Sequence, residues 1–361
     1  MRSWLSVLIA DARTKKRDDI PIAPSLYSLS NKMDNSLLAV RDINHKYIVV
    51  EMRNIIMLVN TKEMLLNAYD GGYAIGGFNI NNMETIQAIV ETANKLKSPV
   101  ILQVSEGTIR YAKLSYLMNM IQAADDNSDI PIAIHLDHGS NYSICKECID
   151  AGFTSVMIDG SRKSFSENIN MTKEVVKYAH ERGVTVEGEL GRIEGINLKE
   201  GEQFTDPDQV EEFVQKTGVD SLAIAIGTSH GAYKFKMEEK PELRFDILEE
   251  IMERMDRLPI VLHGASSVMQ EYVEKIKEYG GEIGNPIGIP EELLRKASKM
   301  AVCKINIDSD LRLAATAALR ESIFNLKSNI DPRQFLDKAR ENMAEVVSHK
   351  IEDVLGSKNK I

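Results

Sequence analysis

Several residue types are scarce in this 361-residue chain, and each shortage narrows the class of protein. Three cysteines are too few for a disulfide framework and favour a reducing compartment, so we expect a cytoplasmic protein. No stretch reaches the roughly 18 to 20 apolar residues that span a membrane. The 44 basic residues are outnumbered by 54 acidic ones, and the net charge of -10 argues against nucleic-acid binding, which needs clustered Lys and Arg.

The cysteines form one short motif. Cys145 and Cys148 are spaced as C-x-x-C in "CKEC", which is the spacing of half a zinc or redox site. Only Cys303 remains to complete such a site, and the segment "NYSICKECIDAG" predicts a helix with the pair one turn apart. We therefore interpret the pair as structural.

Most of the chain, from about residue 58, repeats one pattern: an apolar run, a polar loop and an amphipathic helix. In "ETIQAIVETANKLK", for example, Ile86, Ile89, Val90, Ala93 and Leu96 fall on one helix face. The apolar, β-branched runs are "YAIGGFNI" from Tyr73, "PVILQVS" from Pro99, "PIAIHLDH" from Pro131, "TSVMIDG" from Thr154, "VTVEGEL" from Val184, "SLAIAIG" from Ser221, "LPIVLHG" from Leu258 and "AVCKINID" from Ala301.

This alternation predicts the fold class. Strands that are apolar on both faces and separated by helices imply a parallel sheet with right-handed crossovers. Eight such units predict an α/β fold, a (β/α)8 TIM barrel with an additional C-terminal helix. An open doubly wound sheet is the alternative, but no G-x-G-x-x-G follows the first run. Residues 1–56 break the pattern, so we predict an N-terminal extension of uncertain structure there and a barrel domain over 57–361, with Met57 a candidate native start.

Polar side chains follow the apolar runs. In a (β/α)8 barrel the active site lies at the carboxyl ends of the strands, so these side chains should gather there. They are Asn79, Ser105, Asp137 with His138, Asp159, Glu187 with Glu189, His230, His263, and Asn306 with Asp308.

Histidine is concentrated at these ends. Four of the seven histidines follow the third, sixth and seventh runs. Three converging neutral imidazoles with an open fourth position are the ligand set of a catalytic zinc. We therefore predict that His138, His230 and His263 bind Zn²⁺.

The stretch "AIHLDHGS" contains a fourth histidine in a different position. Alternate residues of a strand share a face, so His135 and Asp137 point together and His138 points away. For Asp137 and His138 to reach one site, the strand must end between them and turn, which Gly139 would permit. His135 then lies deeper and is predicted to support the other two.

Several ordered motifs resemble one family. "HLDHG", "GTSHGAYK", "VLHGASS", "KINIDSDLR" and the later "DPRQFLDKAR" resemble the motifs of class II, metal-dependent fructose-bisphosphate aldolases. The resemblance covers about residues 57 to 357. It implies reversible cleavage of fructose 1,6-bisphosphate to dihydroxyacetone phosphate and glyceraldehyde 3-phosphate, in glycolysis or gluconeogenesis.

The resemblance also implies roles for individual residues. Zinc would be held by His138, His230 and His263, and Asp137 would be the acid/base for the C4 hydroxyl. Asp159 and Glu189 match a second or alternate metal site, and a monovalent cation, Na⁺ or K⁺, is expected nearby. Arg333 would reach into a neighbouring subunit of a homodimer or homotetramer. The implied substrate-binding residues are Asn79, Ser105, Gly231, Lys234, Gly264, Ser266, Asn306, Asp308, Ser309, Arg312 and Arg333.

These roles agree with the chemistry of the reaction. Aldol cleavage places negative charge on the C2 oxygen, and a metal with neutral ligands keeps its full charge to stabilise it. Backbone N–H groups near Gly231, near Gly264 and at the helix after "NIDSD" can hold phosphate. One departure concerns the loop after the fifth run. The family often has Gly-Gly-x-Glu-Asp there, whereas this chain has "GRIEGINLKEGEQF", and Glu194 has no assigned role.

Other functions remain open at this point. Tagatose 1,6-bisphosphate, or another ketose bisphosphate, is the alternative substrate. A Schiff-base aldolase would use Lys304, the one tempting lysine within a run. A metal-dependent amidohydrolase usually opens with H-x-H, where this chain has "FNIN". A non-catalytic barrel that binds sugar phosphates is the alternative from a different class of protein.

Overall fold

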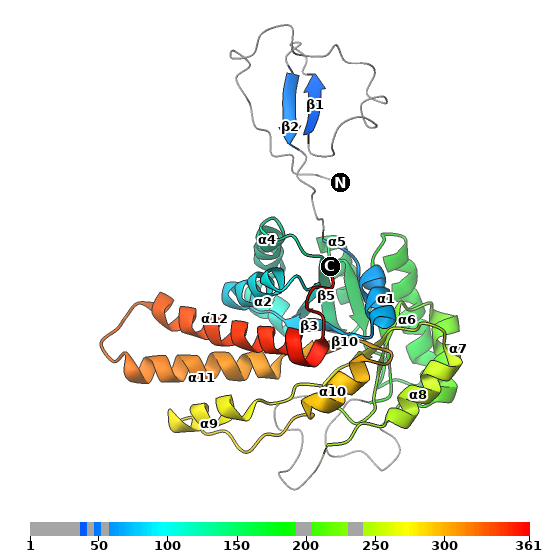
Figure 1. Ribbon diagram of the computed structural model, residues 1–361. Helices are drawn as coiled ribbons and strands as arrows, with labels where there is room; N and C mark the ends of the chain where they lie inside the picture. Colours follow the sequence, from blue (N-terminus) through cyan, green and yellow to red (C-terminus); the bar gives the residue numbers. More distant parts are fainter. Residues whose placement is uncertain (1–36, 42–46, 52–57, 193–203, 230–240) are drawn as a thin grey trace. The chain divides into compact units, whose positions relative to one another are not determined.

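The computed structural model describes residues 37–41, 47–51, 58–192, 204–229 and 241–361 (Figure 1). Contacts between Cα atoms divide the chain into two compact units, residues 1–56 and 57–361. In the first unit, β1 (Leu37–Arg41) and β2 (Tyr47–Glu51) form an antiparallel pair with Leu37 opposite Glu51.

The second unit is a closed barrel of eight parallel strands, which confirms the (β/α)8 prediction. Each strand coincides with one of the eight predicted runs, although β5 extends one residue beyond its run, to Gly139. Strand β3 closes the barrel by pairing with β10. The strands are β3 (Ile75–Asn79), β4 (Val100–Ser105), β5 (Ile132–Gly139), β6 (Ser155–Ile158), β7 (Thr185–Leu190), β8 (Ser221–Ile224), β9 (Ile260–Leu262) and β10 (Val302–Ile307).

Helices surround the strands, as Figure 1 shows. Those that precede or follow β3 to β8 are α1 (Thr61–Gly71), α2 (Met83–Lys95), α3 (Glu106–Ala112), α4 (Leu114–Asp125), α5 (Tyr142–Ala151), α6 (Phe165–His180), α7 (Pro207–Thr217) and α8 (Phe245–Arg254). Between β9 and β10 lie α9 (Gln270–Glu278) and α10 (Glu291–Ser298). After β10 come α11 (Ser309–Asn325), the additional C-terminal helix α12 (Pro332–His349) and a π-helix, η2 (Lys350–Leu355). Figure 1 shows α11 and α12 side by side, and α12 also contacts α2.

Helix α2 illustrates why these segments become helices. The Asn82 side chain accepts a hydrogen bond from the N–H of Thr85 while the Thr85 hydroxyl accepts one from the N–H of Asn82, a reciprocal cap that satisfies two otherwise unpaired donors. Ile86, Ile89 and Val90 lie on the buried face that the sequence predicted. Burying this apolar face, rather than helix propensity, supplies most of the stability of such a helix.

The three cysteines are buried and free. Cys145 and Cys148 lie one turn apart in α5 and pack into the main hydrophobic core, as a structural pair would. Burial raises the pKa of the Cys148 thiol to about 12, so a reactive thiolate is disfavoured. Among the described helices, none combines the length and apolar character that crossing a bilayer requires.

A buried carboxylate at the end of α4 gives a test of stability. Asp125 is 4% exposed, and its Oδ1 has no hydrogen-bond partner among the described residues. Burial, with the neighbouring charge of Asp126, raises the pKa of Asp125 to about 6. The native state therefore holds its proton more tightly than the unfolded chain, whose carboxyl has a pKa of about 4. Stability from this group falls as the pH rises from about 4 to about 6.

We predict that Asp125→Asn stabilises the protein at pH 7 by roughly 1–3 kcal/mol, because the variant buries no charge. The gain should shrink towards pH 4, where Asp125 is protonated in the native wild type. Urea unfolding of both proteins across this pH range measures the difference. A gain that is the same at every pH would contradict the assigned cause.

Candidate metal centre and active site

The end of β5 brings two adjacent residues to one site. The strand continues through His138 to Gly139, and its pairing with β6 shifts register between Leu136 and Gly139. His138 adopts a left-handed backbone conformation, with φ 53°, within this irregularity. The expectation that the strand ends and turns through Gly139 was therefore wrong. Gly139 is needed for close approach instead, since a Cβ there would lie 2.6 Å from the carbonyl oxygen of Met157.

His138 and His263 face one another across the barrel mouth. The Nε2 of His138 lies 2.9 Å from the Nδ1 of His263, and the rings meet edge to face. Each ring's other nitrogen contacts a carboxylate: His138 Nδ1 lies 3.2 Å from Asp159 Oδ2, and His263 Nε2 lies 2.6 Å from Glu187 Oε1. Assigning the protons from this network makes these outer nitrogens the donors. The two nitrogens that face each other, His138 Nε2 and His263 Nδ1, then share one proton in the absence of a metal, with His138 Nε2 donating to His263 Nδ1. A metal ion would take the place of that proton and have both inner nitrogens as ligands.

The surroundings favour a cation. Glu189 is buried, and its Oε2 has no hydrogen-bond partner among the described residues. Burial and the charge of Asp159 raise the pKa of Glu189 to about 8. Burial opposes protonation of His138, but Asp159, Asp137 and Glu189 outweigh it and raise the pKa of His138 to about 9. Ligand atoms of Asp137, His138 and His263 lie within 4.8 Å of one another, and so do those of His138, Asp159 and Glu189. Both groups therefore fit a bound cation.

Asp137 is held beside the facing imidazoles by two amides. Its Oδ2 accepts a hydrogen bond from the Nδ2 of Asn79 at 2.7 Å, and its Oδ1 accepts one from the Nδ2 of Asn306 at 3.3 Å. The Oδ1 of Asn79 in turn accepts a bond from the Nε2 of Gln103, which fixes the orientation of that amide. Burial would raise the pKa of Asp137, but His138, His263 and the bond from Asn79 lower it overall. The carboxylate is therefore ionised and oriented.

A buried ion pair lies beneath the histidines. The Nζ of Lys304 lies 2.7 Å from Glu187 Oε2 and 3.1 Å from the Nε2 of His135, whose Nδ1 contacts the Ser155 hydroxyl at 2.8 Å. Burial and the Lys304 charge hold the pKa of His135 well below its usual range, so the ring is neutral and accepts from Lys304. Lys304 is thus engaged as a charged donor, which does not suit a Schiff-base nucleophile.

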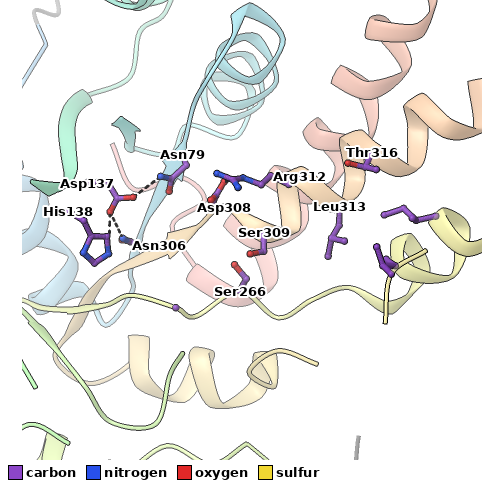
Figure 2. Close-up of a pocket in the computed structure, with 13 residues that line it drawn as sticks. Asn79, Asp137, His138, Ser266, Asn306, Asp308, Ser309, Arg312, Leu313 and Thr316 are labelled. Carbon is purple, nitrogen blue, oxygen red and sulfur yellow. Dashed lines mark hydrogen bonds and ion pairs between the residues drawn. The ribbon is translucent and has the colours of Figure 1, made fainter. Parts of the chain in front are cut away.

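A cavity of about 450 Å³ opens next to Asp137 and His138. Figure 2 shows Asn79 and Asn306 gathered around Asp137 at one end and Leu313 and Thr316 at the other. The predicted site residues that line the cavity are Asn79, Asp137, His138, Gly264, Ser266, Asn306, Asp308, Ser309 and Arg312.

Two predicted substrate residues lie elsewhere among the described part of the chain. Ser105 ends β4 and caps α3, with its hydroxyl accepting a hydrogen bond from the N–H of Thr108, and it is not among the cavity-lining residues. Arg333 is exposed on α12 and forms an ion pair with Asp331. His230, Gly231, Lys234 and Glu194 lie outside the described residues.

Sequence reasoning placed Glu187 at the end of its strand without giving it a role. Its partner His263 is 76 residues away and Lys304 is farther, so only the closed barrel brings them together. A usable signal was the spacing of Glu187 and Glu189, which places both carboxylates on one face of β7.

A closed (β/α)8 barrel with these donors at the carboxyl ends of its strands has the architecture of a metal-dependent barrel enzyme. Residues 59–360 match the family described as class II fructose-bisphosphate aldolase. A fructose-bisphosphate aldolase of Treponema pallidum is 50% identical over 83% of this chain and 96% of its own. One of Giardia intestinalis is 46% identical over 81% and 92%. The crystal structure of the YdjI aldolase from Escherichia coli K12 aligns with a TM-score of 0.70 at 30% identity, covering 84% of this chain and 99% of that one.

The chain therefore belongs to the class II fructose-bisphosphate aldolase family, as its motifs predicted. Members of this family are metal-dependent lyases that act on a sugar bisphosphate and cleave fructose 1,6-bisphosphate reversibly. This membership removes the amidohydrolase alternative and, together with the pairing of Lys304, the Schiff-base alternative.

We predict that Glu187→Gln weakens binding of a divalent metal by roughly tenfold, because a neutral amide supports the His263 ring less well than a carboxylate. Competition with a chromogenic chelator measures the affinity without any assay of activity. The matched control is Glu174→Gln, at an exposed position of α6. Unchanged metal affinity in Glu187→Gln would rule out this support.

Proposed function

We propose that this protein cleaves fructose 1,6-bisphosphate reversibly to dihydroxyacetone phosphate and glyceraldehyde 3-phosphate, with Zn²⁺ held by His138, His263 and the predicted third ligand His230. The observation that carries the proposal is the pair of inner imidazole nitrogens, 2.9 Å apart, next to an oriented Asp137. Zinc is favoured because neutral imidazole nitrogens are its preferred ligands in hydrolytic and lyase sites. When bound, the ion would act as a Lewis acid towards the substrate's C2 oxygen.

Asp137 is proposed as the acid/base. Cleavage requires removal of the C4 hydroxyl proton, and condensation requires its return, so one carboxylate can serve both directions. Asn79 and Asn306 hold the two oxygens of Asp137 in a fixed orientation. The charges of His138 and His263, with the bond from Asn79, lower the pKa of Asp137 and keep it ionised in the absence of substrate. Asp159 and Glu189 support His138 and form the proposed alternate metal position.

The dihydroxyacetone-phosphate half is proposed to lie between the loop after β9 and the start of α11. Gly264, Ser266 and Ser309 line the cavity there, and Figure 2 shows the side chains of Ser266 and Ser309 close together. A helix N-terminus offers N–H groups and a favourable dipole to a phosphate. Arg312 lies one turn further along α11, where its Nε contacts Asp308 at 2.7 Å, and it is the proposed cation for phosphate charge. We also propose that Lys234 binds the substrate and that a monovalent cation is bound near Gly231.

The remaining expectations concern assembly and compartment. We propose a homodimer or homotetramer, supported by apolar side chains near the α11–α12 connection: Ile323 is 60% exposed, Phe324 56% and Ile330 94%. Arg333, exposed on α12, is the residue proposed to reach a neighbouring subunit. The buried free cysteines support a reducing, cytoplasmic location.

Removal of the metal tests the reaction class. We expect EDTA to abolish cleavage of fructose 1,6-bisphosphate and added Zn²⁺ to restore it, because the proposed mechanism stabilises the charge on the C2 oxygen with the metal ion. A coupled assay of triose phosphate release measures this, with tagatose 1,6-bisphosphate as the parallel substrate. Activity that survives chelation, with substrate trapped on the protein by borohydride, would overturn the metal mechanism. Faster cleavage of the tagatose sugar would shift the substrate assignment.

Asp137→Ala tests the acid/base role. We predict a loss of kcat of at least roughly 100-fold, because positioned general acid/base groups contribute about 10²–10⁴-fold. Zinc content, measured by elemental analysis, should stay near wild type, since the inner nitrogens of His138 and His263 remain. The control is Asp129→Ala, at an exposed position before β5. An Asp137→Ala enzyme with near-normal turnover would contradict the role.

A further inference from the structure

The loop between β9 and α9 contains a backbone conformation that its sequence disfavours. Val268 has φ 58°, in the left-handed region, and its side chain is buried. Valine is β-branched, and left-handed conformations are rare and unfavourable for such residues. Conformations of this kind persist only where surrounding contacts impose them, and they gather at functional sites.

Asp310 supplies those contacts. It lies fully buried in the first turn of α11, and its Oδ1 accepts a hydrogen bond from the N–H of Val268 at 2.7 Å. Its Oδ2 accepts one from the N–H of Ser267 at 3.1 Å. One carboxylate thus binds two consecutive amides of the loop and joins the loop to the start of α11.

Lys350 neutralises this carboxylate. Its side chain is buried, and its Nζ lies 3.1 Å from Asp310 Oδ2 and 2.5 Å from Glu291 Oε1. It also donates a hydrogen bond to the Ser267 hydroxyl. Lys350 begins the π-helix η2 directly after α12, and π-helical turns are frequent at functional positions. The C-terminal helix therefore contributes the buried cation of this cluster.

The same loop faces the cavity on its other side. Gly264 and Ser266 line the cavity, and so does Ser309, the residue that precedes Asp310. The Ser266 carbonyl accepts a hydrogen bond from the N–H of Ile289, which limits movement of the loop from that side. Asp310 thus connects the two segments that line the proposed phosphate site, the loop after β9 and the start of α11.

We propose that Lys350 and Asp310 are positioning residues for the phosphate of the dihydroxyacetone-phosphate half. They hold the loop in the conformation that presents Gly264 and Ser266 beside Ser309. This inference rests on the proposed function, because the phosphate site is part of that proposal.

A purely structural role for the cluster explains less. A buried ion pair contributes little net stability, since the cost of removing two charges from water offsets their attraction. The ion pair between Lys350 and Asp310 is therefore a poor explanation of the cluster if its only role is stability. What an apolar replacement cannot do is accept two amide N–H groups and impose the left-handed conformation at Val268.

Lys350→Met tests the proposal in the condensation direction. We expect KM for dihydroxyacetone phosphate to rise about tenfold, the size of effect that follows from disturbing charge-assisted hydrogen bonds. KM for glyceraldehyde 3-phosphate and kcat should stay within about twofold, because the loop faces only one half of the substrate. Glu291→Gln, a milder change in the same cluster, should raise KM for dihydroxyacetone phosphate less. It keeps the test available should Lys350→Met not fold.

The matched control is Val346→Ala, at a buried position of α12 one turn before Lys350, which lowers stability without touching the loop. Its kinetic constants should match wild type. Equal increases in both KM values, or a loss of kcat alone, would overturn the proposal. So would a raised KM for dihydroxyacetone phosphate in Val346→Ala.

Amide hydrogen exchange without substrate tests the positioning independently of catalysis. The peptide covering 263–269 should exchange faster in Lys350→Met than in either wild type or Val346→Ala. Unchanged exchange would refute the positioning role even in an active enzyme. If exchange is faster in Lys350→Met but the wild-type protein cleaves no sugar bisphosphate, the result counts against the proposed function alone.

Discussion

The geometry of the candidate metal centre depends on one buried carboxylate, Glu187, which contacts both an imidazole and an ammonium group. Glu187 Oε1 lies 2.6 Å from His263 and its Oε2 lies 2.7 Å from Lys304, and all three side chains are buried. A buried ammonium needs a counter-charge, and a ligating imidazole needs an acceptor for its outer N–H. Because Glu187 satisfies both requirements, the tautomer of His263 and the charge of Lys304 are set together. His135, neutral and hydrogen-bonded to Lys304, completes the arrangement on the side away from the cavity.

The second constraint is geometric. Consecutive residues of a regular strand point to opposite faces, so Asp137 and His138 could not both reach the cavity from an undistorted β5. The register shift against β6 and the left-handed backbone of His138 resolve this conflict. The absence of a side chain at Gly139 then lets β5 pass close to the Met157 carbonyl. The irregular end of β5 therefore depends on both the left-handed His138 and Gly139, whereas the sequence prediction attributed it to Gly139 alone.

The fold could be predicted from the sequence because the alternation of apolar runs and amphipathic helices is a local pattern that repeats eight times. The same holds for the clustering of Asp137, His138 and His263, since strand ends of a parallel barrel meet at one face. Contacts between residues that are far apart in the sequence could not be predicted, because no local pattern indicates them. Ser105 follows a strand like the others, but its hydroxyl serves the N–H of Thr108 at the start of α3. Lys350 lies 40 residues after Asp310, and the helical pattern of its segment does not indicate that its side chain is buried or paired with Asp310.

The charge balance near α11 shows how an acidic protein can accept an anion. The chain carries a net charge of -10, and the helix that faces the cavity begins with Asp308 and Asp310, two acidic residues that would repel a phosphate. Each is paired: Arg312 contacts Asp308, and Lys350 contacts Asp310 from behind. Pairing of this kind offsets the repulsion from the two carboxylates, so that the helix dipole, the N–H groups of the first turn and the remaining donors of Arg312 can act on a phosphate at the proposed site. At the proposed phosphate site, short-range donors would thus attract the anion, while the long-range charge of the protein is screened by salt within about 10 Å.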